Sequence, residues 1–223
     1  MTKTQILKKT EIFARAEMSE LVDTSHDFSH VLRVKVWAEK IALSEGLDKF
    51  KMQMVALLHD IGQGKENYEK GLLHAEMSEI IARPFLEGIK EISLEDRDEI
   101  LEAIKRHGRG DKNDKPLTKA FKDADRLDCV GTLSILRATI FCHDLPICNS
   151  LKSFADKKVY DPEEIAQFKK AKKPMYNDIV GAIIWNNNNF HAAMFTKTGK
   201  SLEKPFFEET NIFLRSLKKR IKL

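Results

Sequence analysis

Apolar side chains at helical spacing run through almost the whole chain, and this periodicity constrains the fold more than any other feature. Stretches that alternate apolar and polar residues, as a half-buried strand would, are nearly absent. Only 10 Gly and 6 Pro interrupt the pattern in 223 residues. We therefore predict an all-α fold, with helices over about residues 3–20, 28–46, 48–61, 73–89, 95–107, 117–143, 161–170, 175–194 and 202–220.

The chain length fits one large domain or two small ones, and no composition shift marks a convincing boundary between domains. We predict a single domain over residues 1–223, with a core over about 20–145 and C-terminal helices over 175–223 that pack on this core. Residues 144–174 are the least periodic part, so they are either an inserted subdomain or a cover that shapes substrate access. The string "WNNNNF" at 185–190 predicts a helix break.

Charge and cysteine content limit the classes of partner. The net charge of +4 suits an anionic small molecule but is too dispersed to indicate a nucleic-acid-binding protein or a nuclease. Three cysteines without zinc-like spacing indicate reduced thiols in a cytoplasmic protein. The chain lacks a secretory apolar segment and any apolar run near membrane-span length, so no membrane partner is expected. A homodimer is compatible with the sequence.

Several helices turn a polar residue toward the predicted core. These inward residues are His30, His59, His107 and Asp125, and Asp60 lies about 100° further round the helix axis from His59. Buried polar groups need partners, and a shared metal ion would satisfy all of them together. The alternatives are core histidines with ordinary partners, and a helix C-terminus at His59–Asp60 with a solvated carboxylate.

The other two His–Asp pairs have simpler interpretations. Asp27, or Ser29, is placed to cap the helix that begins near residue 28. His26 precedes His30 by about one helical turn and can line the same cavity. His143 ends a helix, where an imidazole complements the helix C-terminus, and we assign it no chemistry.

Three strings, "HDFSHVLRV", "VALLHDIG" and "DADRLDCVG", together resemble the HD-domain superfamily of metal-dependent phosphohydrolases. The string "AAMFTKTGKSL" is similar to a segment that follows the catalytic core in small bacterial members. The resemblance implies an HD-domain helical bundle with additional C-terminal helices. It also implies that one divalent metal ion is held by His30, His59, Asp60 and Asp125. This mixture of N and O ligands suits Mn, Mg, Fe, Co or Ni.

The resemblance further implies a phosphohydrolase that acts on a nucleotide or a related phosphorylated small molecule. Cleavage of a nucleoside triphosphate to a monophosphate and pyrophosphate is one known activity in this branch. We expect one ion rather than two, although His74 and His107 are placed to hold a second ion or to contact phosphate. The expected catalytic residues are Asp60, His74, His107 and Asp128, and the expected substrate-binding residues are His26, Lys65 and Arg126. Many relatives have Lys directly after the "HDIG" glycine, where this chain has Gln63.

The alternative function is a non-hydrolytic HD module that senses a nucleotide. A module of that kind need not keep every metal ligand, whereas this chain has all four residues of the signature. The complete set therefore favours an enzyme.

Overall fold

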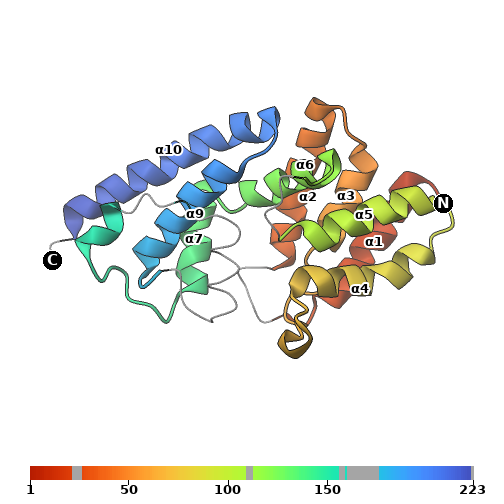
Figure 1. The fold of residues 1–223 in the computed structure, drawn as a ribbon, viewed down its shortest axis with the longest axis horizontal. Helices are drawn as coiled ribbons and strands as arrows, with labels where there is room; N and C mark the ends of the chain where they lie inside the picture. Colours follow the sequence, from red (N-terminus) through yellow and green to blue (C-terminus); the bar gives the residue numbers. More distant parts are fainter. Residues whose placement is uncertain (22–26, 109–112, 156–158, 160–175, 222–223) are drawn as a thin grey trace. The chain divides into compact units, whose positions relative to one another are not determined.

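The computed structural model describes the whole chain except residues 22–26, 109–112, 156–158, 160–175 and 222–223. Across the described residues the structure consists of helices and connecting segments, with one isolated β-bridge between Asn67 and Leu72. The predicted all-α fold is confirmed. The chain divides into two compact units, Met1–Asp125 and Arg126–Leu223 (Figure 1). A single domain over residues 1–223 stays a prediction.

The first unit is a bundle built around a central apolar helix. Its helices are α1 (Lys3–Glu17), α2 (Phe28–Glu45), α3 (Lys49–Leu58), α4 (His74–Glu87), α5 (Leu94–Arg106) and α6 (Pro116–Leu127), with a short 3₁₀ turn, η2 (Tyr68–Lys70). The unit boundary falls within α6, whose last two residues belong to the second unit. Helix α3 packs against α1, α2 and α5, and α4 packs against α5 (Figure 1). All residues from Met52 to Leu58 are buried, because α3 is enclosed by its neighbours.

Side-chain oxygens cap the starts of two helices of this unit, and the cap at Asp27 is one expected from the sequence. The Asp27 carboxylate accepts the backbone N–H of His30 at 3.1 Å and caps α2. Ser93 caps α5 in the same way by accepting the N–H of Asp96 at 3.1 Å. Side-chain oxygens at these positions satisfy backbone donors that the first helical turn leaves without partners.

In its described residues, the second unit has three longer helices around a small apolar core. Its elements are α7 (Gly131–Phe141), a 3₁₀ turn η3 (Leu151–Ala155), α9 (Ile179–Ala193) and α10 (Lys197–Arg220). Helices α7, α9 and α10 pack against one another, and Cys142, Val180, Ile183 and Leu214 are buried between them. All three cysteines of the chain are free thiols, as expected.

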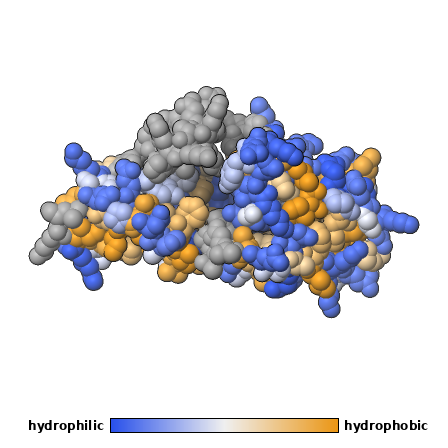
Figure 2. Space-filling model, turned by 90° about the horizontal axis from the view of Figure 1, so that it is seen from below, coloured by the Kyte–Doolittle hydropathy of each residue, from blue (hydrophilic) through white to orange (hydrophobic). Residues whose placement is uncertain are grey.

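No helix in the described part of the chain is long and apolar enough to cross a membrane. On the face drawn in Figure 2, hydrophilic and apolar side chains are interspersed. The expected cytoplasmic location and the absence of a membrane partner stay predictions.

The prediction of one helix over residues 117–143 is wrong, because the chain turns between Leu127 and Gly131. Gly131 adopts a φ of +67°, and a Cβ atom there would lie 2.6 Å from a carboxylate oxygen of Glu209. That carboxylate accepts the backbone N–H of Thr132 at 3.1 Å and caps the new helix α7. A residue far along the chain therefore stabilises the break, which local periodicity does not reveal.

The helix break predicted at 185–190 is also wrong, since α9 continues to Ala193. The asparagine side chains find partners that leave the helix intact: Asn189 donates to the Trp185 carbonyl at 2.9 Å, and Asn187 donates to the Asn211 side chain at 3.2 Å. Helix α10 begins at Lys197 rather than at 202, because Thr196 caps it by accepting the N–H of Gly199 at 2.8 Å.

Asp178 offers a test of how the second unit is held together. Its buried carboxylate accepts hydrogen bonds from Gly181 N at 2.6 Å, Asn149 N at 2.7 Å and Ser153 Oγ at 3.0 Å. We expect Asp178→Ala to lower the free energy of unfolding of this unit by about 2–3 kcal/mol, because a cap and two further donors lose their acceptor. Asp178→Asn keeps one acceptor oxygen and should lose less.

The measurement is urea unfolding followed by Trp185 fluorescence in a Trp37→Phe background, since Trp185 belongs to the second unit. Equal unfolding midpoints for Asp178→Ala and the parent protein would show that these hydrogen bonds contribute no net stability.

Candidate metal centre

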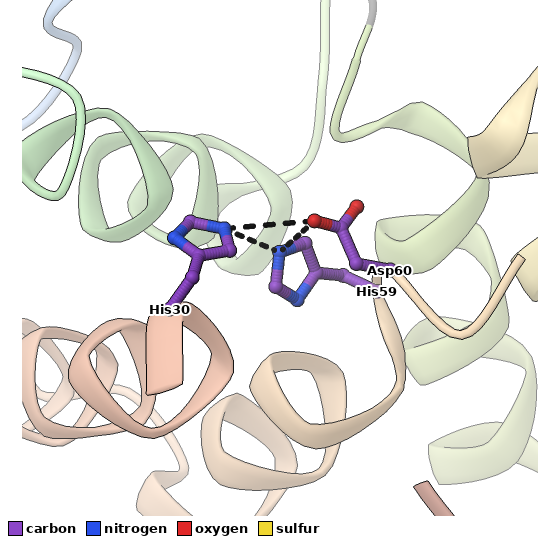
Figure 3. A group of neighbouring side chains, drawn as sticks. All are labelled: His30, His59 and Asp60. Carbon is purple, nitrogen blue, oxygen red and sulfur yellow. Dashed lines mark hydrogen bonds and ion pairs between the residues drawn. The ribbon is translucent and has the colours of Figure 1, made fainter. Parts of the chain in front are cut away.

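Four residues expected to bind a metal come together inside the first unit. The imidazoles of His30 and His59 approach each other with their Nε2 atoms 3.3 Å apart. One carboxylate oxygen of Asp60, Oδ2, lies 3.5 Å from Nε2 of His30 and 3.3 Å from Nε2 of His59 (Figure 3). Asp125 Oδ1 lies 3.4 Å from Nε2 of His30 and 3.8 Å from Nε2 of His59. Side chains from α2, from the end of α3 and from α6 thus converge on one point.

A second group of ligand atoms surrounds the other oxygen of Asp60. Oδ1 of Asp60 lies 3.5 Å from Nε2 of His107 and 3.9 Å from Nε2 of His74. The two imidazole nitrogens lie 3.1 Å apart. Among the described residues, both this group and the group of His30, His59 and Asp60 have ligand atoms close enough to hold an ion. The single carboxylate of Asp60 therefore joins two pairs of histidines, one pair at each oxygen.

His59 and His107 are held in the same way at equivalent positions. Each follows the last residue of its helix, and its Nδ1 lies close to the carbonyl oxygen three residues earlier, Ala56 at 2.9 Å and Ile104 at 2.6 Å. In the neutral imidazole, a proton on Nδ1 leaves Nε2 as a lone pair that faces Asp60. The Phe121 ring packs edge-on against both imidazoles, with centroid distances of 5.2 and 6.2 Å. Phe121 lies one helical turn before Asp125, and this spacing in the sequence indicates that the two side chains share the inward face of α6.

Gly62 explains how the His59–Asp60 segment reaches helix α4. The Gly62 N–H donates to Ser78 Oγ at 2.9 Å, within α4. A Cβ atom at position 62 would lie 2.3 Å from Ser78 N and 2.6 Å from the carbonyl oxygen of His74. Only a residue without a side chain permits this approach, which brings Asp60 next to His74 at the start of α4.

Electrostatics at the centre favours a bound cation. Burial would raise the pKa of Asp60 and of Asp125, but the neighbouring histidines outweigh this effect and hold the pKa of both carboxyls well below the usual range. Burial likewise opposes a charge on His59, yet the carboxylates of Asp60 and Asp125 raise its pKa to about 9. Two buried carboxylates are thus ionised, and the metal-free protein holds a proton on His59 as a partial counter-charge.

The donor set fits a divalent ion. Imidazole nitrogens and carboxylate oxygens without thiolate suit Mn, Mg, Fe, Co or Ni, in agreement with the sequence. The side chains of His30, His59, Asp60 and His107 are at most 4% exposed, whereas those of Asp125 and His74 are 24% and 29% exposed. Each group therefore has one member that solvent reaches, and a ligand can approach the centre from these two side chains.

The residues expected to contact substrate have partners of their own. Nζ of Lys65 donates to the carbonyl and carboxylate oxygens of Glu17 at 2.9 and 2.7 Å. Within the second unit, Arg126 donates to the Ala193 carbonyl at 2.6 Å and lies over the Phe195 ring. These contacts position both cations, and their role toward substrate stays a prediction. His26 lies outside the described residues.

Two aspartates near the signature are buried. Asp128, expected to be catalytic, is fully buried in the second unit and accepts from Arg137 Nη1 at 2.9 Å, and its catalytic role is still a prediction. Asp123, in α6, is also buried, with 0% exposure. Its charge does not indicate this burial, since polarity alone does not show which face of α6 packs inward. The expected cover over 144–174 lies mostly outside the described residues.

Comparison with protein families agrees with the geometry. The family model described as "HD domain" matches residues 27–129. This segment contains His30, the His59–Asp60 pair and Asp125. Residues 27–129 thus form an HD domain, and the predicted HD-type helical architecture is confirmed. Among curated proteins, no sequence matches the chain.

Solved structures share the fold over nearly the whole chain. Bacillus subtilis YpgQ, solved in complex with ADP, is 22% identical with a TM-score of 0.64, over 99% of this chain and 97% of that one. An HD-superfamily hydrolase from Bacillus thuringiensis is 21% identical with a TM-score of 0.71, over 98% of each chain. A predicted HD-superfamily hydrolase from an uncultured Thermotogales bacterium is 22% identical with a TM-score of 0.65, over 99% of each chain. At these identities the likeness shows a shared fold.

Gly62→Ala tests the close approach at α4. The added methyl group overlaps the α4 backbone, so the turn must move and we expect a loss of stability of about 2–3 kcal/mol together with weaker metal binding. Gly88→Ala is the matched control, because its Cβ would meet no atom closer than 3.5 Å. Thermal unfolding and Mn²⁺ titration calorimetry measure the two effects. Equal unfolding temperatures and equal Mn²⁺ affinities in Gly62→Ala and Gly88→Ala would show that the contact between Gly62 and α4 does not position Asp60.

Metal binding should depend on pH through His59. Because the pKa of His59 is raised to about 9 in the metal-free protein, an ion must displace a proton at neutral pH. The affinity for Mn²⁺ should therefore increase by about tenfold per pH unit between pH 7 and pH 9 and level off above that range. Calorimetry in buffers of different ionisation enthalpy, under nitrogen, measures the released proton. An affinity that is constant from pH 7 to pH 9 would contradict this protonation state.

Proposed function

We propose that this protein is a metal-dependent phosphohydrolase that acts on a nucleotide or a related phosphorylated small molecule. The observation that carries the proposal is the buried Asp60 carboxylate, each of whose oxygens faces a pair of imidazole nitrogens at 3.3–3.9 Å. Arrays of this kind, with two ionised carboxylates and little solvent, are suited to divalent ions. The HD-domain match over residues 27–129 supports the same chemistry.

We extend the proposal to two ions, although the sequence favours one. His30, His59 and Asp125 would hold the first ion with Oδ2 of Asp60, and His74 and His107 would hold the second with Oδ1. The similarity of the two groups supports this extension, because Nδ1 of His59 and of His107 each lies beside the carbonyl oxygen three residues earlier, and each Nε2 lies beside an oxygen of Asp60. Bound divalent ions would polarise a phosphate oxygen and lower the pKa of a coordinated water.

The chain's own residues contribute position and proton transfer. The backbone carbonyls behind His59 and His107 and the ring of Phe121 fix both imidazoles, so the site needs little reorganisation when substrate binds. Asp125 and His74, the partly exposed members, lie where a substrate phosphate can enter. If the second group holds no ion, His74 and His107 are placed to exchange a proton through Nε2. Asp128 would then act as an orienting carboxylate.

A nucleotide substrate is supported by two observations. The Bacillus subtilis protein with the same fold was solved in complex with ADP. The net charge of +4 favours an anionic ligand, and Lys65 and Arg126 are the proposed phosphate-contacting cations. Cleavage of a nucleoside triphosphate to a monophosphate and pyrophosphate is the version we test first. The competing function is a nucleotide-sensing module without turnover.

Asp60→Asn is the direct test of the reaction. We expect it to reduce hydrolysis to the level of a metal-free control, because it removes the charge shared by both groups. Metal-reloaded protein is incubated with nucleoside mono-, di- and triphosphates and cyclic nucleotides, and products are followed by ³¹P NMR, which separates phosphate from pyrophosphate. Asp48→Asn is the control, since Asn retains an oxygen that can cap α3.

The outcomes separate the alternatives. Full activity in Asp60→Asn with verified metal content would reject the site assignment. Release of inorganic phosphate alone would reject the pyrophosphate version and keep the phosphohydrolase. Absence of turnover across the panel in metal-loaded wild-type protein, with nucleotide still bound, would favour the sensing module.

A further inference from the structure

A buried cluster of three charged side chains lies between α5 and α6. Asp114, just before α6, directs Oδ1 to Arg106 Nε at 2.5 Å and Oδ2 to Lys122 Nζ. The side chains of Asp114 and Lys122 are both 0% exposed, and that of Arg106 is 28% exposed. A single carboxylate therefore joins the last residue of α5 to the second turn of α6.

Burial excludes a direct role for Asp114 and Lys122 in binding substrate. The Lys122 ammonium has no access to solvent, so a phosphate cannot reach it. A buried charge is strongly unfavourable without a partner, whereas a pair with good geometry is tolerated. Asp114 is a partner of both cations and so connects Arg106 to Lys122.

The chain segments that Asp114 joins are those that carry the metal centre. Arg106 directly precedes His107, whose Nε2 lies 3.5 Å from Asp60. Lys122 directly follows Phe121, whose ring contacts the imidazoles of His59 and His107. The same helix α6 carries Asp125 three residues later. A shift of either segment would change the position of His107 relative to Asp60, while His30 and His59 belong to other helices.

We propose that Asp114 is a positioning residue that keeps His107 facing Asp60 and so maintains the second metal group. This inference rests on the two-ion centre proposed above. Loss of the carboxylate should release the end of α5 and lower the affinity of the group formed by Asp60, His74 and His107. The group of His30, His59, Asp60 and Asp125 should change less, because only Asp125 lies on α6, while His30 lies on α2 and His59 and Asp60 follow α3.

The test is Mn²⁺ titration calorimetry on the full chain, together with electron paramagnetic resonance, which distinguishes a coupled ion pair from a single ion. In Asp114→Asn, we expect the second dissociation constant to rise by about 10- to 100-fold, the first to stay within about threefold, and the coupled-pair signal to disappear. Arg106→Gln should produce the same selective loss, and this partly exposed position keeps the Asp114–Lys122 pair intact if Asp114→Asn does not fold.

Lys51→Met is the matched control. Lys51 also forms ion pairs with α5, with Nζ at 3.0 Å from Asp96 and 2.6 Å from Glu99, but toward the opposite end of the helix from His107. The Lys51→Met protein should bind both ions with wild-type affinity. Folded Arg106→Gln protein with wild-type affinity for both ions, or with an equal loss at both, would overturn the positioning role. A wild-type protein that binds one ion would instead overturn the two-ion centre itself, and this inference with it.

Discussion

The ionised carboxylate of Asp60, buried at the end of α3, is the constraint on which the first unit depends. A carboxylate at 4% exposure is strongly unfavourable unless each of its oxygens has a partner. Four imidazoles supply those partners, and they come from α2, α4 and the ends of α3 and α5. Three features hold these imidazoles around one carboxylate. They are the close approach at Gly62, the backbone carbonyls beside His59 and His107, and the ring of Phe121.

In this arrangement a proton and a metal ion compete for the same side chains. Without an ion, the raised pKa of His59 indicates that a proton on its imidazole partly balances Asp60 and Asp125. The contribution of this proton to stability is present at acidic and neutral pH and is lost as pH rises through about 9. A divalent ion bound at this centre would replace the proton with a larger charge at the same atoms. The site is thus prepared for a cation before it binds one, and its ligands need little movement.

The sequence predicted the helices of the first unit from local periodicity, and the residues at its centre from periodicity together with the family resemblance, which pointed to His74. His30, His59 and Asp125 lie on apolar helix faces, which single-chain patterns reveal. Other features depend on distant residues: Glu209 stabilises the break before Gly131, and Glu17 pairs with Lys65. The buried Asp114 lies in a Gly- and Lys-rich loop, where polarity suggests solvent. Long-range pairing of charges is not encoded in spacing, so these features could not be predicted.

The most direct test of the account is a crystal structure of the protein grown with Mn²⁺, with anomalous diffraction used to locate the ions. We predict two anomalous peaks beside the Asp60 carboxylate, one within coordination distance of His30, His59 and Asp125 and the other within coordination distance of His74 and His107. The absence of a peak at Asp60 in crystals that hold Mn²⁺ elsewhere would contradict the central claim that this buried carboxylate is a metal ligand.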